Sequence, residues 1–345
     1  MQLNSNFSIN DELFSLDKWK KDGYFWQHST DTHWIEFSES VKEWLSEEEF
    51  VSIHTSGSTG TPKEILLSKK AMFQSARATA EFFQLGEKSQ VLLCLSSRYI
   101  AGKMMVVRAM VNGWHLVVQP ASSTPLQNQD SVFDFVAMVP MQVEHSLHEI
   151  EKCRKIIIGG AKLSDKLREQ LLSKNVQAFE TYGMTETATH IAIKSIDDTV
   201  FRSLPHVNIS TDHRNCLVIA NEFLPDGKIT TNDVVDLIGD NSFHWKGRAD
   251  FIINSGGVKI NPEAVEDKLS KYIHRRFFVA GIPDELLGEK VVLIIEGDEY
   301  SISEDIFSDL SKYEKPKAVY FINQFLETDT HKILLKQTVE TIVKG

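Results

Sequence analysis

The 345-residue chain has few cysteines, no long apolar run and no excess of positive charge, and each absence excludes a class of protein. Its three cysteines, Cys94, Cys153 and Cys216, lie far apart and form no CxxC pair. This spacing excludes a disulfide framework or a cysteine zinc site, and it is typical of a reducing compartment. No apolar stretch approaches the roughly 20 residues that a membrane-spanning helix requires. The net charge of −11 argues against a nucleic-acid-binding protein.

The chain also lacks a recognisable targeting segment, an internal repeat and a low-complexity region. Residues 1–18 are polar and acidic, with no cationic start followed by an apolar run, so nothing there resembles a signal peptide. Hydrophobic residues make up 42% of the chain and charged residues 25%, as in ordinary globular proteins. We therefore expect a soluble cytoplasmic protein with no integral membrane association, built of about two domains at roughly 150 residues each.

Short apolar runs alternate with helical patterns through most of the chain, which predicts an α/β fold with a largely parallel sheet covered by helices. In the stretch 68–83, for example, Met72, Ala76, Thr79 and Phe83 recur at helical spacing. Strands are expected at 50–53, 91–95, 115–118, 133–139, 155–158 and 216–220. Helices are expected at 68–83, 103–112, 141–152 and 164–172.

The last hundred residues predict a smaller α+β domain. Asn261, Pro262 and Glu263 form a helix start, because asparagine caps, proline fits the first turn and an acidic side chain favours the N-terminus. This helix is expected to extend to Leu269, and a second helix is expected at 304–312. Strands are expected at 251–253, 277–280, 291–295 and 318–322.

A glycine- and hydroxyl-rich stretch carries the strongest functional signal. It follows a predicted strand and precedes a predicted helix, and it consists of Thr55, Ser56, Gly57, Ser58, Thr59, Gly60, Thr61, Pro62 and Lys63. The glycines permit close backbone approach to a polyphosphate, and the hydroxyls and the lysine add donors and positive charge. The stretch is not a Walker A loop, because Thr61 and Pro62 precede Lys63 and Glu64 follows it.

This loop resembles the phosphate loop of the adenylate-forming superfamily, which includes acyl- and aryl-CoA synthetases, luciferases and adenylation domains of peptide synthetases. The resemblance implies a large N-terminal domain of layered sheets and helices and a small mobile α+β C-terminal domain. We place these domains at 1–249 and 250–345. Only 54 residues precede the loop, so the resemblance also implies a shortened first subdomain.

Two further motifs of the superfamily follow in order. Gly159, Gly160, Ala161 and Lys162 are similar to a strand-ending segment beside the adenine and the acyl group, and glycines at a strand's carboxyl end permit close ligand approach. The second motif is Thr181, Tyr182, Gly183, Met184, Thr185, Glu186 and Thr187. By resemblance, Tyr182 stacks on adenine, Thr185 contacts the phosphates and Glu186 ligates the Mg²⁺ of ATP, a role suited to carboxylate oxygen.

The ribose and hinge motifs lie further along the chain. Asp233, in Thr231-Asn232-Asp233, resembles the carboxylate that holds the ribose hydroxyls, although Asn232 replaces the family's glycine. Arg248 resembles a second ribose or phosphate contact, and Asp250 resembles the hinge between the two domains.

Two motifs of the small domain resemble those that serve the two half-reactions. Ser255, Gly256, Gly257, Val258 and Lys259 are similar to the loop that admits the CoA thiol. Lys332 matches the lysine that bridges the carboxylate and the α-phosphate during adenylation, although His331 replaces the usual glycine. The resemblance thus implies an ATP-dependent, Mg²⁺-dependent ligase that uses coenzyme A as co-substrate.

The acid substrate is less well defined by the sequence. The stretch 96–105 occupies the place of the acyl pocket, and with the compact length it resembles o-succinylbenzoate–CoA ligases of menaquinone (vitamin K2) biosynthesis. The second carboxylate of that substrate would need a cation, for which Arg98, Lys103 and Lys162 are candidates; Tyr99 and Gly102 complete the predicted pocket. Three alternatives remain open: a ligase for another aryl or acyl acid, an adenylation enzyme that loads a carrier protein, and a non-catalytic nucleotide-binding homologue. The oligomeric state does not follow from the sequence.

Overall fold

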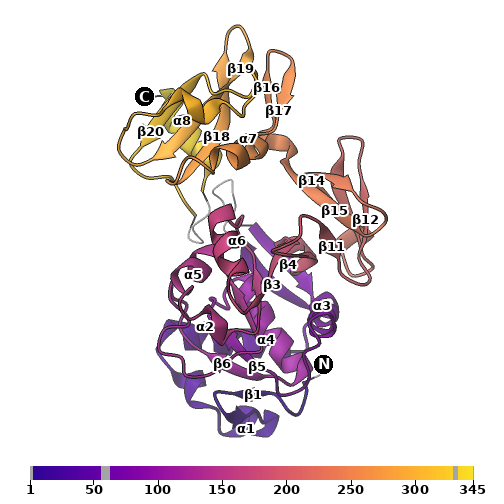
Figure 1. Ribbon diagram of the computed structural model, residues 1–345. Coiled ribbons are helices and arrows are strands. Elements are labelled where there is room, and N and C mark those ends of the chain that lie inside the picture. The colour runs from indigo at the N-terminus through magenta and orange to yellow at the C-terminus, as the bar shows by residue number, and fades with distance from the viewer. Residues whose placement is uncertain (1–2, 56–62, 329–332, 345) are drawn as a thin grey trace. The chain divides into compact units, whose positions relative to one another are not determined.

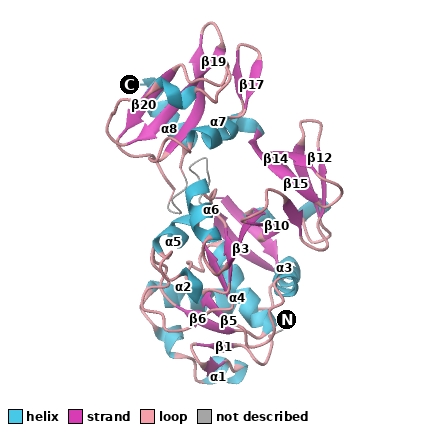
Figure 2. Ribbon diagram, in the orientation of Figure 1, coloured by secondary structure: helices cyan, strands magenta, loops and turns pink. Residues whose placement is uncertain are grey.

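The computed structural model describes residues 3–55, 63–328 and 333–344, which form two compact units (Figure 1). The first unit comprises residues 3–55, 63–208 and 220–229. The second comprises residues 209–219, 230–328 and 333–344. Helices and strands alternate through the first unit, whereas strands make up most of the second (Figure 2).

The first unit is built on a mixed sheet with the strand order β11-β10-β9-β8-β7-β5-β6-β1-β2. Its centre is parallel, as predicted, and pairs β6 with β5, β5 with β7, β7 with β8 and β8 with β9. The parallel strands are β5 (Gln90–Leu93), β6 (His115–Val118), β7 (Phe135–Met138), β8 (Lys155–Ile158) and β9 (Gln177–Gly183). The flanking strands are β1 (Ser8–Ile9), β2 (Glu12–Leu13), β10 (His190–Ser195) and β11 (Phe201–Ser203).

Helices cover both faces of this sheet. Val91 and Leu93 of β5 face one core and Leu92 faces the other, because successive strand residues point to opposite faces. The first face packs against α2 (Thr32–Leu45), α3 (Lys69–Phe82) and α4 (Ile100–Asn112), and the second packs against α5 (Pro140–His145) and α6 (Asp165–Leu172). The remaining short helices of this unit are α1 (Leu16–Lys21), η1 (Phe25–His28), η2 (Ile150–Lys152), η3 (Thr185–Thr187) and η4 (Pro225–Gly227).

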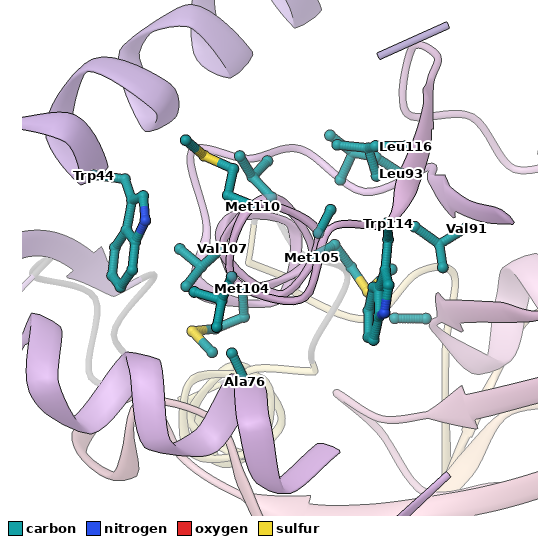
Figure 3. Packing of buried hydrophobic residues seen from close by; sticks show 14 of the residues in the cluster. Trp44, Ala76, Val91, Leu93, Met104, Met105, Val107, Met110, Trp114 and Leu116 are labelled. Atoms are coloured by element: carbon teal, nitrogen blue, oxygen red, sulfur yellow. The ribbon is translucent and has the colours of Figure 1, made fainter. Parts of the chain in front are cut away.

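Helix α4 is apolar almost all round and lies at the centre of the larger core. Met104 and Val107 face Trp44 and Ala76, whereas Met105 faces Trp114 and the strand residues on the opposite side (Figure 3). A helix that is hydrophobic on all sides belongs in an interior. Gly113 ends α4 in the left-handed conformation, with φ +69°, which glycine adopts without steric cost.

The helix starts predicted at 68 and 164 agree with the observed caps. The hydroxyls of Ser68 and Ser164 accept hydrogen bonds from the backbone N–H of Ala71 and Leu167, at the starts of α3 and α6. Two parts of the prediction for this unit were wrong. The helix expected at 141–152 is not continuous, because α5 ends at His145 and only the 3₁₀ turn η2 forms at Ile150–Lys152. The phosphate loop does not lead directly into a helix, because β4 (Lys63–Ser68) follows it and pairs antiparallel with β3 (Phe50–Thr55). These two strands form a separate ribbon.

The second unit contains two groups of strands. One has the order β12-β13-β14-β15, with bounds Asn208–Thr211, Cys216–Ala220, Lys228–Leu237 and Ser242–Arg248. The other has the order β17-β16-β19-β18, with β20 (Ala318–Ile322) parallel to β19. Its strands are β16 (Ile253–Ser255), β17 (Val258–Ile260), β18 (Phe277–Asp284) and β19 (Gly288–Glu296).

Helices α7 (Pro262–Leu269) and α8 (Leu335–Lys344) accompany these strands. The helix predicted at 304–312 was wrong, because only the 3₁₀ turn η6 (Glu304–Phe307) forms there. The backbone N–H groups of Ser308 and Leu310 donate three residues back, to Asp305 and Phe307, and this short spacing lets Phe307 and Leu310 both reach the core.

Among the residues that the structure describes, no helix is long and apolar enough to cross a membrane.

Candidate functional site

The predicted motif Gly159-Gly160-Ala161-Lys162 lies in the turn that ends β8. Gly160 has φ +87° and is exposed, as are Ala161 and Lys162. A Cβ at Gly159 would stand 2.6 Å from Oγ1 of Thr181, whose hydroxyl donates to the carbonyl of Ile158 at 3.2 Å. The carboxyl ends of β8 and β9 therefore fit closely, and they leave the Gly160–Lys162 turn accessible at the edge where parallel sheets bind ligands.

The second motif lies at the end of β9 and in η3. The Oγ1 of Thr187 accepts from the backbone N–H of Met184 at 3.1 Å and donates to the carbonyl of Thr189 at 2.6 Å. These bonds hold the turn that carries half-buried Thr185 and exposed Glu186. Gly183 fits against the start of β10, because a Cβ there would lie 2.4 Å from the carbonyl oxygen of Thr189.

Strand β4, which follows the phosphate loop, lies beside this turn. Thr55 and Lys63 are cross-strand partners at the ends of β3 and β4, and β4 contacts η3. The backbone thus brings β4, the strand that follows the loop, next to the turn of Thr185 and Glu186. The predicted phosphate-binding residues Ser56, Gly57, Ser58, Thr59, Gly60 and Thr61 lie outside the described residues, as does Lys332.

A charged and aromatic platform behind Tyr182 did not follow from the sequence. Glu180, on β9, lies 2.6 Å from Arg168 Nη2 and 3.0 Å from Lys194 Nζ. Lys194 lies 4.8 Å above the ring of Phe201, whose centroid is 6.0 Å from that of half-buried Tyr182. Glu180 and Lys194 are visible in the sequence as single charges of opposite sign, but their pairing depends on the register of β9 and β10.

A buried cation beneath the same turn was also missed. Arg108 of α4 is 1% exposed, and its Nη2 donates to Oγ1 of Thr189 at 2.8 Å. The same nitrogen lies 3.3 Å from His190 Nδ1, so that ring nitrogen accepts and Nε2 carries the proton. Burial, reinforced by the charge of Arg108, holds the pKa of His190 well below its usual value, so the imidazole is neutral. Burial also lowers the pKa of Arg108 to about 9.

The five acyl-pocket candidates have different surroundings. Arg98 is exposed and Tyr99 is half-buried just before α4. Gly102 is buried, and a Cβ there would stand 2.2 Å from the carbonyl oxygen of Ser96. Lys103 is also buried and forms an ion pair with Glu43. Glu43 therefore already compensates the charge of Lys103, whereas the Arg98 and Lys162 side chains reach solvent.

The predicted ribose contacts lie on a β-ribbon of the second unit. Asp233 of β14, 9% exposed, stands directly opposite Arg248 of β15. The register shifts by one residue between Val234 and Val235, which makes Lys246 an extra residue on β15. The indole N–H of Trp245, a residue that we had not predicted, donates to Oδ1 of Asp233 at 3.1 Å.

The predicted hinge residue is joined to one of these contacts. Nε and Nη2 of Arg248 donate to the two carboxylate oxygens of Asp250 at 2.9 and 3.1 Å. Burial raises the pKa of Asp250, but the hydrogen bonds and charge of Arg248 outweigh burial and hold the pKa below its usual value. The Arg248 guanidinium also lies 5.6 Å above the ring of Phe251.

The predicted thioester loop is a tight hairpin between β16 and β17. Gly256 and Gly257 have φ +59° and +80°, the left-handed conformations that a two-residue hairpin turn favours. Both glycines and Lys259 are exposed, while Ser255 is buried. The turn is held by the N–H of Gly256, which donates to the carbonyl of Leu287 at 2.8 Å.

Glu186 is the predicted magnesium ligand, and its surroundings fit that ion. No group of three or more His, Cys, Asp or Glu side chains suited to a metal occurs among residues 3–55, 63–328 and 333–344. Mg²⁺ is usually held by one or two carboxylates together with substrate phosphates and water, rather than by a cage of protein ligands. Glu186 offers one exposed carboxylate beside β4, the strand that follows the phosphate loop in the sequence, and so meets that requirement.

Comparison with known proteins identifies the family. The profile described as AMP-binding enzyme matches residues 8–228. The 2-succinylbenzoate–CoA ligase of Escherichia coli is 25% identical over 290 residues, which are 77% of this chain and 61% of the relative. That of Bacillus cytotoxicus is 23% identical over 342 residues, covering 86% of this chain and 71% of the relative. The chain thus spans about three fifths of the length of the E. coli enzyme.

Solved structures show the same relationship. An acyl-CoA synthetase (AMP-forming)/AMP-acid ligase II-like protein from Dyadobacter fermentans is 34% identical, with a TM-score of 0.62. The alignment covers 91% of this chain and 95% of that one. O-succinylbenzoate coenzyme A synthetase from Bacillus subtilis, in complex with ATP and magnesium ion, has a TM-score of 0.75 at 21% identity, and covers 84% of this chain and 69% of that one. This second likeness confirms the predicted α/β fold.

Proposed function

Since this chain belongs to the AMP-binding enzyme family, we propose that it is an ATP-dependent acid–CoA ligase. It would activate a carboxylic acid as an acyl-adenylate and then form an acyl-CoA thioester. The observation that carries the proposal is the meeting of three parts in the first unit. Strand β4, which follows the phosphate loop in the sequence, contacts η3, the turn of Thr185 and Glu186, and Tyr182 precedes that turn on β9.

In the adenylation step the substrate carboxylate attacks the α-phosphorus of ATP and pyrophosphate leaves. The protein acts by positioning and by neutralising charge, rather than as a nucleophile. Tyr182 would stack on the adenine, supported from behind by Phe201 and Lys194. The phosphate loop and Thr185 would hold the phosphates. Bound through Glu186, Mg²⁺ would offset the negative charge of the β- and γ-phosphates.

The second step would use the small domain, residues 250–345. Lys332 would serve adenylation, and a rotation at Asp250 would exchange it for the Ser255–Lys259 loop. The exposed Gly256–Gly257 turn offers a CoA thiol a backbone without side chains to pass. The three cysteines are free and buried, which supports a reducing, cytoplasmic location for the enzyme.

The proposed acid is o-succinylbenzoate, because several curated relatives are 2-succinylbenzoate–CoA ligases. The carboxylate that does not react needs a cationic partner. Arg98 and Lys162 are the better candidates, since both are exposed and Lys103 is neutralised by Glu43.

The decisive experiment is ATP–pyrophosphate exchange across a panel of acids, followed by detection of the CoA product. We expect o-succinylbenzoate to support exchange well above benzoate, and thioester to appear only when CoA is added. Absence of exchange with every acid, by a folded protein, would exclude the ligase. Equal exchange with both acids would exclude the substrate and leave the class intact.

A substitution of the proposed magnesium ligand tests the site with the same assay. Glu186→Gln should lower the exchange rate by about 100-fold, as loss of one preorganised electrostatic group typically does. Glu144→Gln on α5 is a matched control, because it removes a carboxylate of the same unit that lies outside the proposed site. It should leave exchange unchanged.

A further inference from the structure

The ribose carboxylate has a partner that the family motifs do not name. Trp245 is half-buried on β15, and its indole N–H donates to Asp233 Oδ1 at 3.1 Å. Trp245 stands opposite Val235, two residues from Asp233 and therefore on the same face of β14. The backbone N–H of Asp233 donates to Oγ1 of Thr231 at 3.0 Å, which fixes the main chain at the same position.

The chemistry of this pair explains why a tryptophan is useful there. An aspartate carboxylate turns easily about its terminal torsion, which has broad minima, so burial alone does not fix the direction of its oxygens. Indole is a donor only, and an ionised carboxylate is an acceptor only, so the hydrogen bond can form in one direction only. A hydrogen bond to a charged group is among the stronger ones in proteins. Packing against Val235 would need only an apolar side chain, but orienting Asp233 needs the N–H.

We propose that Trp245 is a positioning residue that orients the Asp233 carboxylate toward the ribose hydroxyls of the bound nucleotide. This role rests on the proposed function, in which Asp233 binds ribose. Trp245 does not touch the reacting atoms. It fixes the direction of the carboxylate before the nucleotide arrives, so that binding does not have to order that group.

The test measures how strongly the protein distinguishes ATP from analogues that lack one ribose hydroxyl. Dissociation constants for ATP, 2′-deoxy-ATP and 3′-deoxy-ATP are determined by titration calorimetry for the wild type and for Trp245→Phe, which keeps an aromatic ring and removes the N–H. We expect ATP binding to weaken about tenfold, because a misdirected Asp233 would lose a hydrogen bond to the ribose. One hydrogen bond to a charged group accounts for at least that factor. Binding of the analogue that lacks the contacted hydroxyl should change less than twofold.

A double-mutant cycle supplies the control. On an Asp233→Ala background, Trp245→Phe should have no further effect on the ATP-to-deoxy-ATP ratio, because the group that it orients is gone. Benzothienylalanine at position 245 keeps both rings and replaces only the N–H by sulfur. It should reproduce the effect of phenylalanine, and it remains informative if the smaller ring disturbs folding.

The outcomes separate the proposal from its premise. Equal weakening of ATP and both deoxy analogues, or no weakening of any of them, would overturn the positioning role of Trp245. If Asp233→Ala itself leaves the ATP-to-deoxy-ATP ratio unchanged, the assignment of Asp233 to ribose fails. Absence of nucleotide binding by the wild type would instead refute the proposed function.

Discussion

Gly183 has a packing role besides its place in the nucleotide-binding motif. It ends β9, where the start of β10 passes so close that an added Cβ would lie 2.6 Å from the Cα of His190. Its φ is not in the left-handed region, so the requirement for glycine comes from space rather than from backbone conformation. The sequence placed Gly183 in the motif, but only the fold shows what it packs against.

Gly183→Ala should therefore destabilise the protein by about 1–3 kcal/mol, the usual cost of forcing an added methyl group into occupied space. The free energy of unfolding in urea is the measurement. Because the displaced segment leads into the Thr187–Thr189 contacts that hold the Glu186 turn, exchange activity should fall as well.

Gly86→Ala is the control for that prediction. No heavy atom lies within 4 Å of an added Cβ at Gly86, and its φ is negative or extended. Its unfolding free energy should stay within about 0.5 kcal/mol of the wild type, as surface substitutions usually do. If both variants lose the same stability, the close approach at Gly183 is not the cause.

At the scale of elements, hydrogen bonds join the start of α7 to β15. Oδ1 of Asn261 caps α7 by accepting from the N–H of Glu263 at 2.9 Å, while its Nδ2 donates to the carbonyl of Lys246. Oε1 of Glu263 accepts from the N–H of Arg248 at 3.2 Å. These bonds connect elements on either side of Asp250, the proposed hinge, and a rotation there would have to break them.

Asn261→Ser should loosen this connection while keeping the cap, since serine caps about as well as asparagine but is too short to reach Lys246. Loss of one hydrogen bond, about 1 kcal/mol, shifts a two-state equilibrium roughly fivefold. The ratio of the adenylation rate to the thioester rate should change by up to that factor. If both rates fall equally, the bond does not distinguish the two orientations.

At the scale of the whole molecule, the two half-reactions should be separable by one residue. Lys332→Ala should abolish ATP–pyrophosphate exchange, because the proposed bridge between carboxylate and α-phosphate is lost. Thioester formation from a preformed acyl-adenylate should continue, since that step would use the Ser255–Lys259 loop. Lys271→Ala, which removes an exposed lysine of the same domain, is a control that should leave both steps intact. Equal loss of both half-reactions in Lys332→Ala would contradict this division.

The sequence predicted the parallel sheet and most helices because their signals are local. Caps such as Ser164 and Asn261 and the apolar run of α4 act within one element. Strand β4 was missed because its pairing with β3 depends on the loop between them. The domain division at residues 249 and 250 stays a prediction, as it concerns motion.

Within the candidate site, motif residues were predictable and their supports were not. Glu186 and Asp233 stand in recognisable short patterns. Trp245 of β15 supports Asp233 on the neighbouring strand, and Arg168 of α6 and Lys194 of β10 meet at Glu180 of β9, through pairings that depend on packing and register. The ion pair between Lys103 and Glu43 joins residues 60 positions apart, which no local pattern reveals.

The extra residue on β15 decides on which face of the strand Arg248 lies. Strand side chains alternate between faces, so Trp245 and Arg248, three positions apart, would point in opposite directions in an uninterrupted strand. Because Lys246 is an extra residue that has no partner position on β14, Trp245 and Arg248 face the same side, and Arg248 stands opposite Asp233. Deleting this single residue would reverse Arg248 without altering any motif letter. Two sequences with identical signatures can thus differ in function through one position that lies outside every motif.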